Sequence, residues 1–122
     1  MAKISDNTIE TLPARARVAV LSIGSNNRTL SENAVNELEF NLVDARKFTI
    51  VDRARLDQIR REQNFQMSGD VSDDSAVSIG NMLGADIVIV GTINTTDSGG
   101  RITIRALDVQ TAQIITMARE QF

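Results

Sequence analysis

The chain has 122 residues, a net charge of −3, and no His, Cys, Trp or Tyr. These absences exclude histidine-based triads, thiol nucleophiles and metal sites built from Cys or His, and the acidic balance argues against nucleic-acid or anionic-membrane binding. The length fits one domain, and no apolar run reaches the roughly 18–20 residues that span a bilayer, so no direct membrane insertion is expected.

Residues 1–16 are predicted to be a short amphipathic lead-in to a single domain over residues 17–122. The large apolar residues of the lead-in are Ile4, Ile9 and Leu12. It lacks the apolar core of a signal peptide, which leaves two alternatives. Either the protein is cytoplasmic, or this is the mature or trimmed form of a longer chain.

A strand and a helix are predicted next. The segment 17–23, RVAVLSI, is apolar at nearly every position, as expected for a strand that is buried on both faces. Ser31 is predicted to cap a helix that runs to about Arg46, because an apolar stripe with helical spacing follows it. Phe40 lies roughly opposite that stripe, so it is either poorly buried or part of an interface.

A second strand, over residues 47–52, ends at Asp52, which is predicted to cap a helix over residues 53–64. A third helix is predicted to begin at Ser72 or Asp73 and to run to about Leu83. Asp73 and Asp74 would lie in its first turn, where the helix dipole favours anions. Gly80 on its buried stripe indicates a close approach to the sheet, and Gly84 is predicted to be its left-handed cap.

The acidic stretch at the start of this third helix admits two chemical alternatives. Asp70, Asp73 and Asp74 suggest a calcium loop, but the loop pattern requires Gly where Ser75 stands and Glu where Asn81 stands. An acid/base carboxylate pair would need a partner in a pocket, and no residue marks one. The helix-start interpretation is therefore preferred, and no catalytic, cofactor-binding or metal site is predicted.

The C-terminal part of the chain predicts an antiparallel meander. A strand over residues 85–97 is followed by a hairpin signal at Ser98, Gly99 and Gly100, an alternating strand over 101–109, a turn, and a last strand over 114–122. The resulting order is β-α-β-α-α-β-β-β. It predicts an α+β fold in which one mixed sheet packs against three main helices.

The segment 46–61 carries six basic residues against Asp52 and Asp57. A solvated helix face is one interpretation. The alternative is a surface for an acidic partner, or for the acidic stretches 32–44 and 70–74 of a second copy. The candidate partner surface consists of Phe40, Arg53, Arg55, Arg60 and Arg61.

Several ordered motifs resemble a known family. They are RVAVLSI, FTIVDRARLDQIRREQ, DDSAVSIGNMLGAD, the strand IVIVGTI and the closing DVQT, and together they span about residues 17–118. This pattern resembles the domain shared by the curli assembly component CsgG and the penicillin-binding-protein activator LpoB. Within this family, the pattern is most similar to that of short LpoB-like proteins from spirochaetes.

The resemblance implies a non-enzymatic periplasmic protein, tethered to the outer membrane by a lipidated Cys, without cofactors or catalytic residues. It implies an LpoB-like regulator that contacts a penicillin-binding protein; the alternatives are a CsgG-like oligomeric assembly subunit and a small-ligand-binding domain. The chain departs from the family in lacking a lipobox Cys and the long hairpins of the CsgG barrel. It also has Ala112 where members place Gly, so that turn either differs or carries a strain of about 1 kcal/mol.

Overall fold

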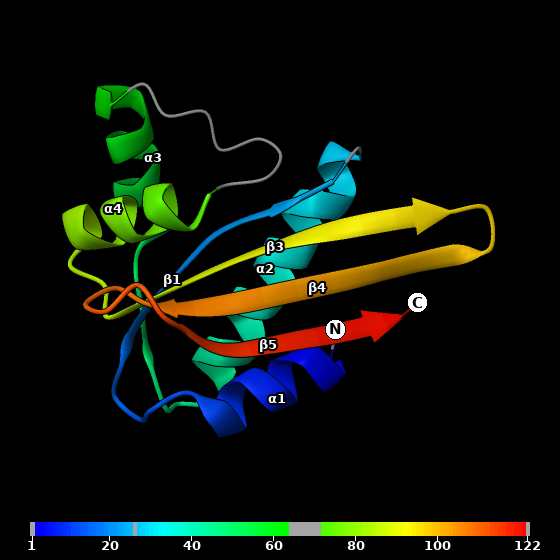
Figure 1. The fold of residues 1–122 in the computed structure, drawn as a ribbon, viewed down its shortest axis with the longest axis horizontal. Coiled ribbons are helices and arrows are strands. Elements are labelled where there is room, and N and C mark those ends of the chain that lie inside the picture. Colours follow the sequence, from blue (N-terminus) through cyan, green and yellow to red (C-terminus); the bar gives the residue numbers. More distant parts are fainter. Residues whose placement is uncertain (1, 26, 64–71, 122) are drawn as a thin grey trace.

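A five-stranded mixed sheet forms the centre of the protein (Figure 1). The computed structural model describes residues 2–25, 27–63 and 72–121. The strand order is β2-β1-β3-β4-β5; β1 pairs in parallel with β2 and β3, and β3, β4 and β5 form the antiparallel meander. The strands are β1 (Arg17–Gly24), β2 (Thr49–Ile50), β3 (Ile87–Thr96), β4 (Gly99–Asp108) and β5 (Ile114–Gln121). The predicted α+β fold, with its order of strands and helices, is confirmed.

Within the described residues, four helices cover the sheet: α1 (Ala2–Thr11), α2 (Arg28–Asp44), α3 (Arg53–Gln63) and α4 (Asp73–Leu83). Both sheet faces carry a hydrophobic core. One core joins α1 and α2 to alternate residues of the strands, such as Ile89 and Ile104, and the other joins α3 and α4 to the residues between them, such as Val88 and Leu107. No described helix is both long and apolar enough to cross a membrane.

The N-terminal segment is a helix rather than a mere lead-in. Ile4 and Leu12 are fully buried in the same core as α2, and α1 lies beside β5 (Figure 1). The Glu120 carboxylate accepts from the Ile4 N–H at 3.2 Å, and Lys47 Nζ donates to the Ile9 carbonyl oxygen at 2.6 Å. An anion near the first turn and a cation near the last turn both match the helix dipole.

The sequence-predicted cap at Ser31 is wrong. The N-cap of α2 is Asn27, whose side chain accepts from the Leu30 N–H at 3.1 Å, so the helix begins at Arg28. Ser31 instead lies inside the first turns and donates from its hydroxyl to the Ile23 carbonyl oxygen, which ties the helix to the end of β1. Asn and Ser are similarly good caps, so residue type alone does not choose between them.

The other predicted helix ends lie close to their expected positions. Asp52 precedes α3 and accepts from the Ala54 N–H at 2.9 Å, while Ser72 is the N-cap of α4 and accepts from the Ser75 N–H at 3.2 Å. Gly84 is the left-handed cap with φ 70°. At Gly80 an added Cβ would lie 2.6 Å from Val88 Cγ1, so only glycine allows this approach of α4 to the sheet.

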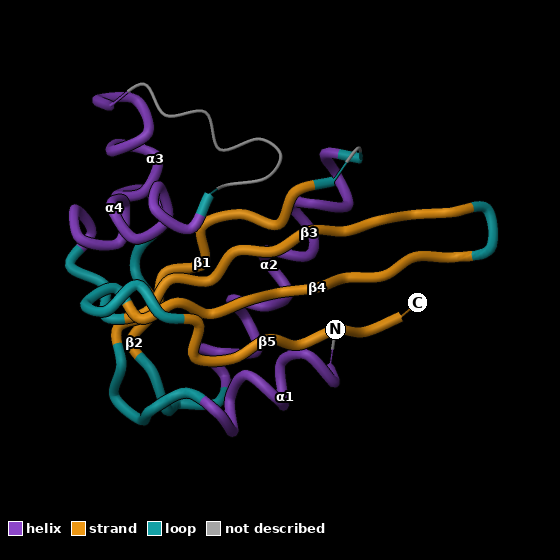
Figure 2. Tube along the Cα trace, viewed as in Figure 1, coloured by secondary structure: helices purple, strands orange, loops and turns teal. Residues whose placement is uncertain are grey.

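The hairpin between β3 and β4 differs by one residue from its prediction. Asp97 and Ser98 form the two-residue turn, because Thr96 already pairs with Gly99. Gly99, at φ 144°, and Gly100 are therefore the first residues of β4 rather than loop residues. The hairpin end projects beyond the helices (Figure 2).

The turn between β4 and β5 places a non-glycine residue in the left-handed region. Ala112 has φ 60°, and its N–H donates to the Asp108 carbonyl oxygen at 2.8 Å. The Asp108 carboxylate accepts from the N–H groups of Gln110 and Thr111 at 2.8 and 3.1 Å. The turn thus keeps the positive φ that glycine would adopt freely, and alanine occupies it at an energetic cost.

Candidate functional site

The described helices leave about half of one sheet face uncovered. Strands β3 and β4 have 10 residues each, and α4 has 11. These lengths correspond to about 33 Å of strand and about 16 Å of helix, so a helix of this size covers about half of the strand length. In Figure 1 the helices α3 and α4 lie over one end of the sheet, and the hairpin half of β3 and β4 extends beyond them.

The open sheet face is polar and basic. Its members alternate with the core residues Ile93, Ile102, Ile104 and Ala118, and thus point away from α1 and α2. We define it by the residues Thr92, Asn94, Thr96, Arg101, Thr103, Arg105, Met117, Arg119 and Gln121. It contains three arginines and no carboxylate, and Met117, on the edge strand β5, is 60% exposed.

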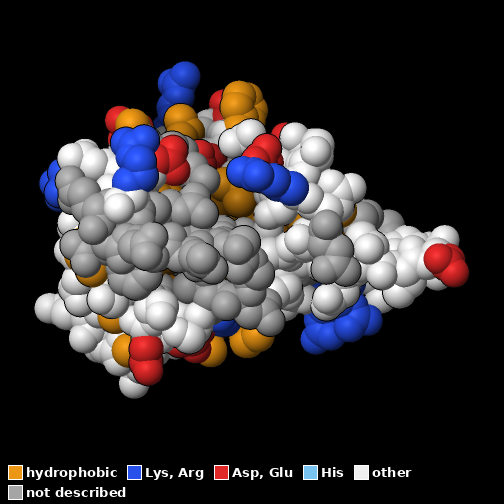
Figure 3. Space-filling view, turned by 90° about the horizontal axis from the view of Figure 1, so that it is seen from above, with side chains coloured by type: hydrophobic (Ala, Val, Ile, Leu, Met, Phe, Trp, Pro, Cys, Tyr) orange, Lys and Arg blue, Asp and Glu red, His pale blue; other side chains and the backbone are white. Residues whose placement is uncertain are grey.

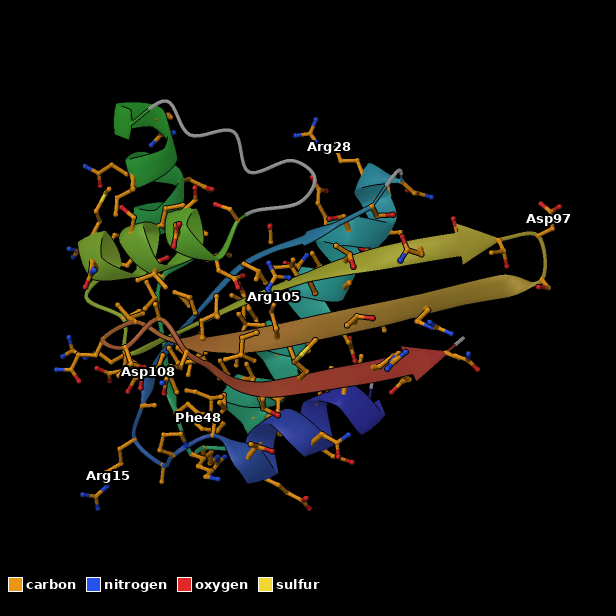
Figure 4. The ribbon with its side chains drawn as sticks, in the orientation of Figure 1. Arg15, Arg28, Phe48, Asp97, Arg105 and Asp108 are labelled. Atoms are coloured by element: carbon orange, nitrogen blue, oxygen red, sulfur yellow. The ribbon has the colours of Figure 1, made fainter. Side chains whose placement is uncertain are left out.

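Arg105 ties the open sheet face to the start of α4. Its Nε lies 2.7 Å from Asp73 Oδ1, and both side chains are partly exposed. Figure 4 labels Arg105 on the sheet. Asp73 therefore has a second role beyond the first turn of the helix, where it and Asp74 lie. No sequence signal links two residues so far apart in the chain, and the open sheet face as a whole was missed for the same reason.

The structure separates the residues of the sequence-predicted partner surface. Phe40 is 66% exposed on α2, whereas Arg55 and Arg61 are exposed on α3, which packs on the opposite face of the sheet. Arg53 and Arg60 belong to the same helix, but their side chains lie outside the described part of the structure. Phe40 and the α3 arginines thus belong to two different surfaces.

The described residues offer little support for small-molecule chemistry. A depression of about 400 Å³ lies at the hairpin end, lined by Asn94, Thr96, Ser98, Gly99, Gly100, Arg101 and Gln121. It lacks the apolar walls that bury most ligands. Among the described residues no three acidic side chains group as metal ligands would; Asp70 of the proposed calcium loop lies outside them.

Comparisons with known proteins assign the family. The family model for the curli production assembly/transport component CsgG matches residues 14–101, which is most of the chain. The chain belongs to the CsgG family. No curated protein matches this CsgG-family chain by sequence.

Solved structures share the fold of this CsgG-family chain at low sequence identity. The LpoB C-terminal domain from Salmonella enterica has a TM-score of 0.83 at 18% identity, with 98% of this chain and 92% of that chain covered. The lipoprotein GNA1162 from Neisseria meningitidis gives 0.69 at 12% identity, with coverage of 87% and 78%. A PelC dodecamer from Paraburkholderia phytofirmans gives 0.52 at 15% identity, with coverage of 92% and 76%.

Proposed function

We propose that this CsgG-family chain is a non-enzymatic adaptor of the bacterial cell envelope, which regulates a peptidoglycan synthase of the penicillin-binding-protein class by contact. The observation that carries this proposal is the likeness to LpoB C-terminal domains over nearly the whole of both chains. It agrees with the motif resemblance in the sequence. The proposed location is the periplasm at the outer membrane, with a lipid anchor on a preceding segment, and the proposal involves no cofactor and no nucleic acid.

The open sheet face is the proposed contact surface. Arginine is enriched at protein interfaces, because its planar guanidinium forms two parallel hydrogen bonds to a carboxylate. Arg101 and Arg119 are exposed there on neighbouring strands, with the exposed thioether of Met117 on the same face. A partner with an acidic surface and an apolar group opposite Met117 would complement this face.

Binding of purified penicillin-binding proteins from the same bacterium tests the proposal. The double charge reversal R101E/R119E is expected to weaken binding at least tenfold, because each reversal replaces an attraction by a repulsion. R15E/R28E is the matched control, since Arg15 before β1 and Arg28 on α2 are both exposed and lie outside the open sheet face and the basic segment. It changes the net charge by the same amount and is expected to leave binding within twofold.

Two results would contradict the proposal in different ways. If the unmodified protein binds none of the penicillin-binding proteins, the regulatory function fails. If R15E/R28E weakens binding as much as R101E/R119E, the effect follows net charge and the open sheet face is not the contact surface. R61E, on α3, tests the basic segment that the sequence singled out.

An oligomeric, CsgG-like assembly subunit without a membrane barrel of its own is the second candidate function. One observation favours it: α2 exposes two large apolar side chains, Phe40 at 66% and Val43 at 56%. The likeness to PelC, which forms a dodecamer, supports the same candidate. A small-ligand-binding role has only the polar depression at the hairpin end in its favour.

A further inference from the structure

The depression at the hairpin end opens on the same side of the sheet as the open sheet face. Its volume is about 400 Å³, and its lining includes Asn94, Arg101 and Gln121. Neither Thr95 nor Ile102 lines it, because residues that alternate with the lining residues point to the other side of the sheet. The polar side chains of three strands therefore converge on this depression.

Three planar side chains form a row across the depression. Asn94 pairs with Arg101 in the register of β3 and β4, and Arg101 pairs with Gln121 in that of β4 and β5. Because neighbouring strands lie about 4.8 Å apart, the order carboxamide, guanidinium, carboxamide extends over about 10 Å. Gly99, which pairs with Thr96 on the same side, has no side chain and leaves space between Arg101 and the turn. We call Asn94, Arg101 and Gln121 the polar row.

A second arginine lies beside the polar row. Arg119 pairs with Thr103, so it is the diagonal neighbour of Arg101, with Cα atoms about 7–8 Å apart. Within the described residues neither guanidinium forms an ion pair or a hydrogen bond, and both side chains are exposed. Figure 3 shows basic side chains gathered along one side of the projecting hairpin. Two positive charges without a counter-ion favour the binding of an anion there.

The carboxylates of the neighbouring segments are directed elsewhere. Glu120 points to the other side of the sheet, where it accepts from the Ile4 N–H at 3.2 Å. Asp73 is paired with Arg105, and Asp97 stands at the tip of the hairpin (Figure 4). The polar row thus presents donors to an acceptor that a ligand has to supply.

We propose that this depression binds the free carboxylate of a short peptide, of the kind that peptidoglycan carries. The Arg101 guanidinium donates two parallel hydrogen bonds to the carboxylate. The carboxamides of Asn94 and Gln121, each both donor and acceptor, bind the adjacent peptide groups. The volume lies at the lower end of the range of about 300–1,000 Å³ for small-molecule sites, which fits a dipeptide better than a protein segment. The described lining has no apolar side chain, which agrees with a ligand that is polar throughout.

The source of the peptide rests on the proposed function, because a peptidoglycan synthase acts on a polymer that carries such peptides. Arg101 also belongs to the proposed contact surface for the synthase. A bound peptide therefore competes with an acidic partner for the same guanidinium. The contact between regulator and synthase then weakens where free peptide carboxylates accumulate.

Titration of the ¹⁵N-labelled protein with N-acetyl-D-alanyl-D-alanine, followed by ¹H–¹⁵N NMR, tests the site. The backbone signals of Asn94, Arg101 and Gln121 are expected to shift and to saturate with a Kd of about 1–10 mM, because a small ligand on an open surface makes few contacts. The same dipeptide with a C-terminal carboxamide is expected to bind roughly fivefold more weakly or less, because it lacks the charged acceptor. Inorganic phosphate is expected to be weaker as well, since it offers no peptide group to the two carboxamides.

Substitutions separate the roles of the polar row. R101Q is expected to weaken dipeptide binding by roughly fivefold or more, because glutamine cannot form the charged, two-pronged contact. R28Q is the matched control, since Arg28 is exposed on α2 and lies outside the polar row. N94A/Q121A is expected to abolish the preference for the dipeptide over phosphate. Circular dichroism of each variant verifies that it is folded.

Co-sedimentation with purified, insoluble peptidoglycan tests the source of the peptide. The unmodified protein and R28Q are expected in the pellet, and R101Q in the supernatant. Peptidoglycan whose carboxylates have been converted to methylamides, with carbodiimide and methylamine, is expected to retain none of them.

Three results would overturn the inference. An absence of NMR shifts at the depression well above the expected Kd rejects the site. Equal affinity for the carboxamide or for phosphate rejects the recognition of a peptide carboxylate. Dipeptide binding without retention on peptidoglycan rejects peptidoglycan as the source. Neither assay contains a penicillin-binding protein, so each of these results leaves the regulatory function to its own binding test.

Discussion

Replacement of Ala112 by glycine is expected to stabilise the protein, although glycine usually destabilises. Ala112 has φ 60° in the turn between β4 and β5, and it is exposed, so loss of its methyl group uncovers no apolar contact. Its N–H bond to the Asp108 carbonyl oxygen, 2.8 Å long, remains available to glycine. The substitution therefore changes the backbone energetics and little else.

The magnitude follows from two opposing terms. A left-handed residue with a Cβ costs about 1–2 kcal/mol, and glycine removes that cost. Glycine also loses more backbone entropy on folding than alanine, which costs about 0.4–1 kcal/mol. The net gain is about 0.5–1 kcal/mol, which for a chain of 122 residues corresponds to a rise in Tm of about 2–4 °C.

Thermal and urea unfolding, followed by circular dichroism because the chain has no Trp or Tyr, measures this gain. Ala45→Gly is the matched control: Ala45 is exposed at the end of α2, but its φ is −65°. It is expected to lose about 0.5–1 kcal/mol, because only the entropic term acts there. If A112G and A45G are destabilising by the same amount, the reasoning from the positive φ is refuted.

Three further substitutions test the packing and the caps. Gly80→Ala is expected to cost on the order of 2 kcal/mol of stability, because the new Cβ would lie 2.6 Å from Val88 Cγ1 and 2.7 Å from Val109 Cγ2. The urea midpoint should partly recover in G80A/V109A. Full stability of G80A alone would contradict the close approach of α4 to the sheet. Ser72→Ala is expected to lose about 1 kcal/mol of cap energy that Ser72→Asp retains, and equal unfolding midpoints for the two would show that the cap contributes little. Asp108→Ala removes the acceptor of two turn N–H groups and should lower Tm by a few degrees, whereas Asp108→Asn, which keeps an acceptor oxygen, should lower it less.

Most of the fold could be predicted because its elements carry strong local signals. The apolar segment 17–23 became β1, a buried strand between β2 and β3, and the alternation of residues 101–109 gave β4 with Ile102 and Ile104 facing one core. The α4 helix has both a cap and a stop, Ser72 and Gly84, in the positions that the sequence indicates. These signals agree with one another, which is the condition for reliable prediction.

The missed features depend on contacts between distant residues. The amphipathic pattern of residues 1–16 gave no sign that α1 joins the core, because its partners Glu120 and Lys47 come from other parts of the chain. The cap of α2 at Asn27 was missed because several polar residues in the same stretch were equally suitable. Prediction of the open sheet face would have required the strand register, which places Arg105 beside Met117. No short motif encodes that register.

The family motifs specify the fold, and for that reason they cannot show whether the protein is a regulator or an assembly subunit. Asp52, Ser72, Gly80 and Gly84 cap, pack or end helices in this chain, so they specify the fold rather than the function. Exposed residues such as Phe40 and Arg119 are free of that constraint, and surface substitutions usually change stability by less than about 0.5 kcal/mol. Variants such as F40D and R101E/R119E should therefore keep the wild-type Tm while they change binding or assembly. A loss of both together would assign these residues to the fold instead.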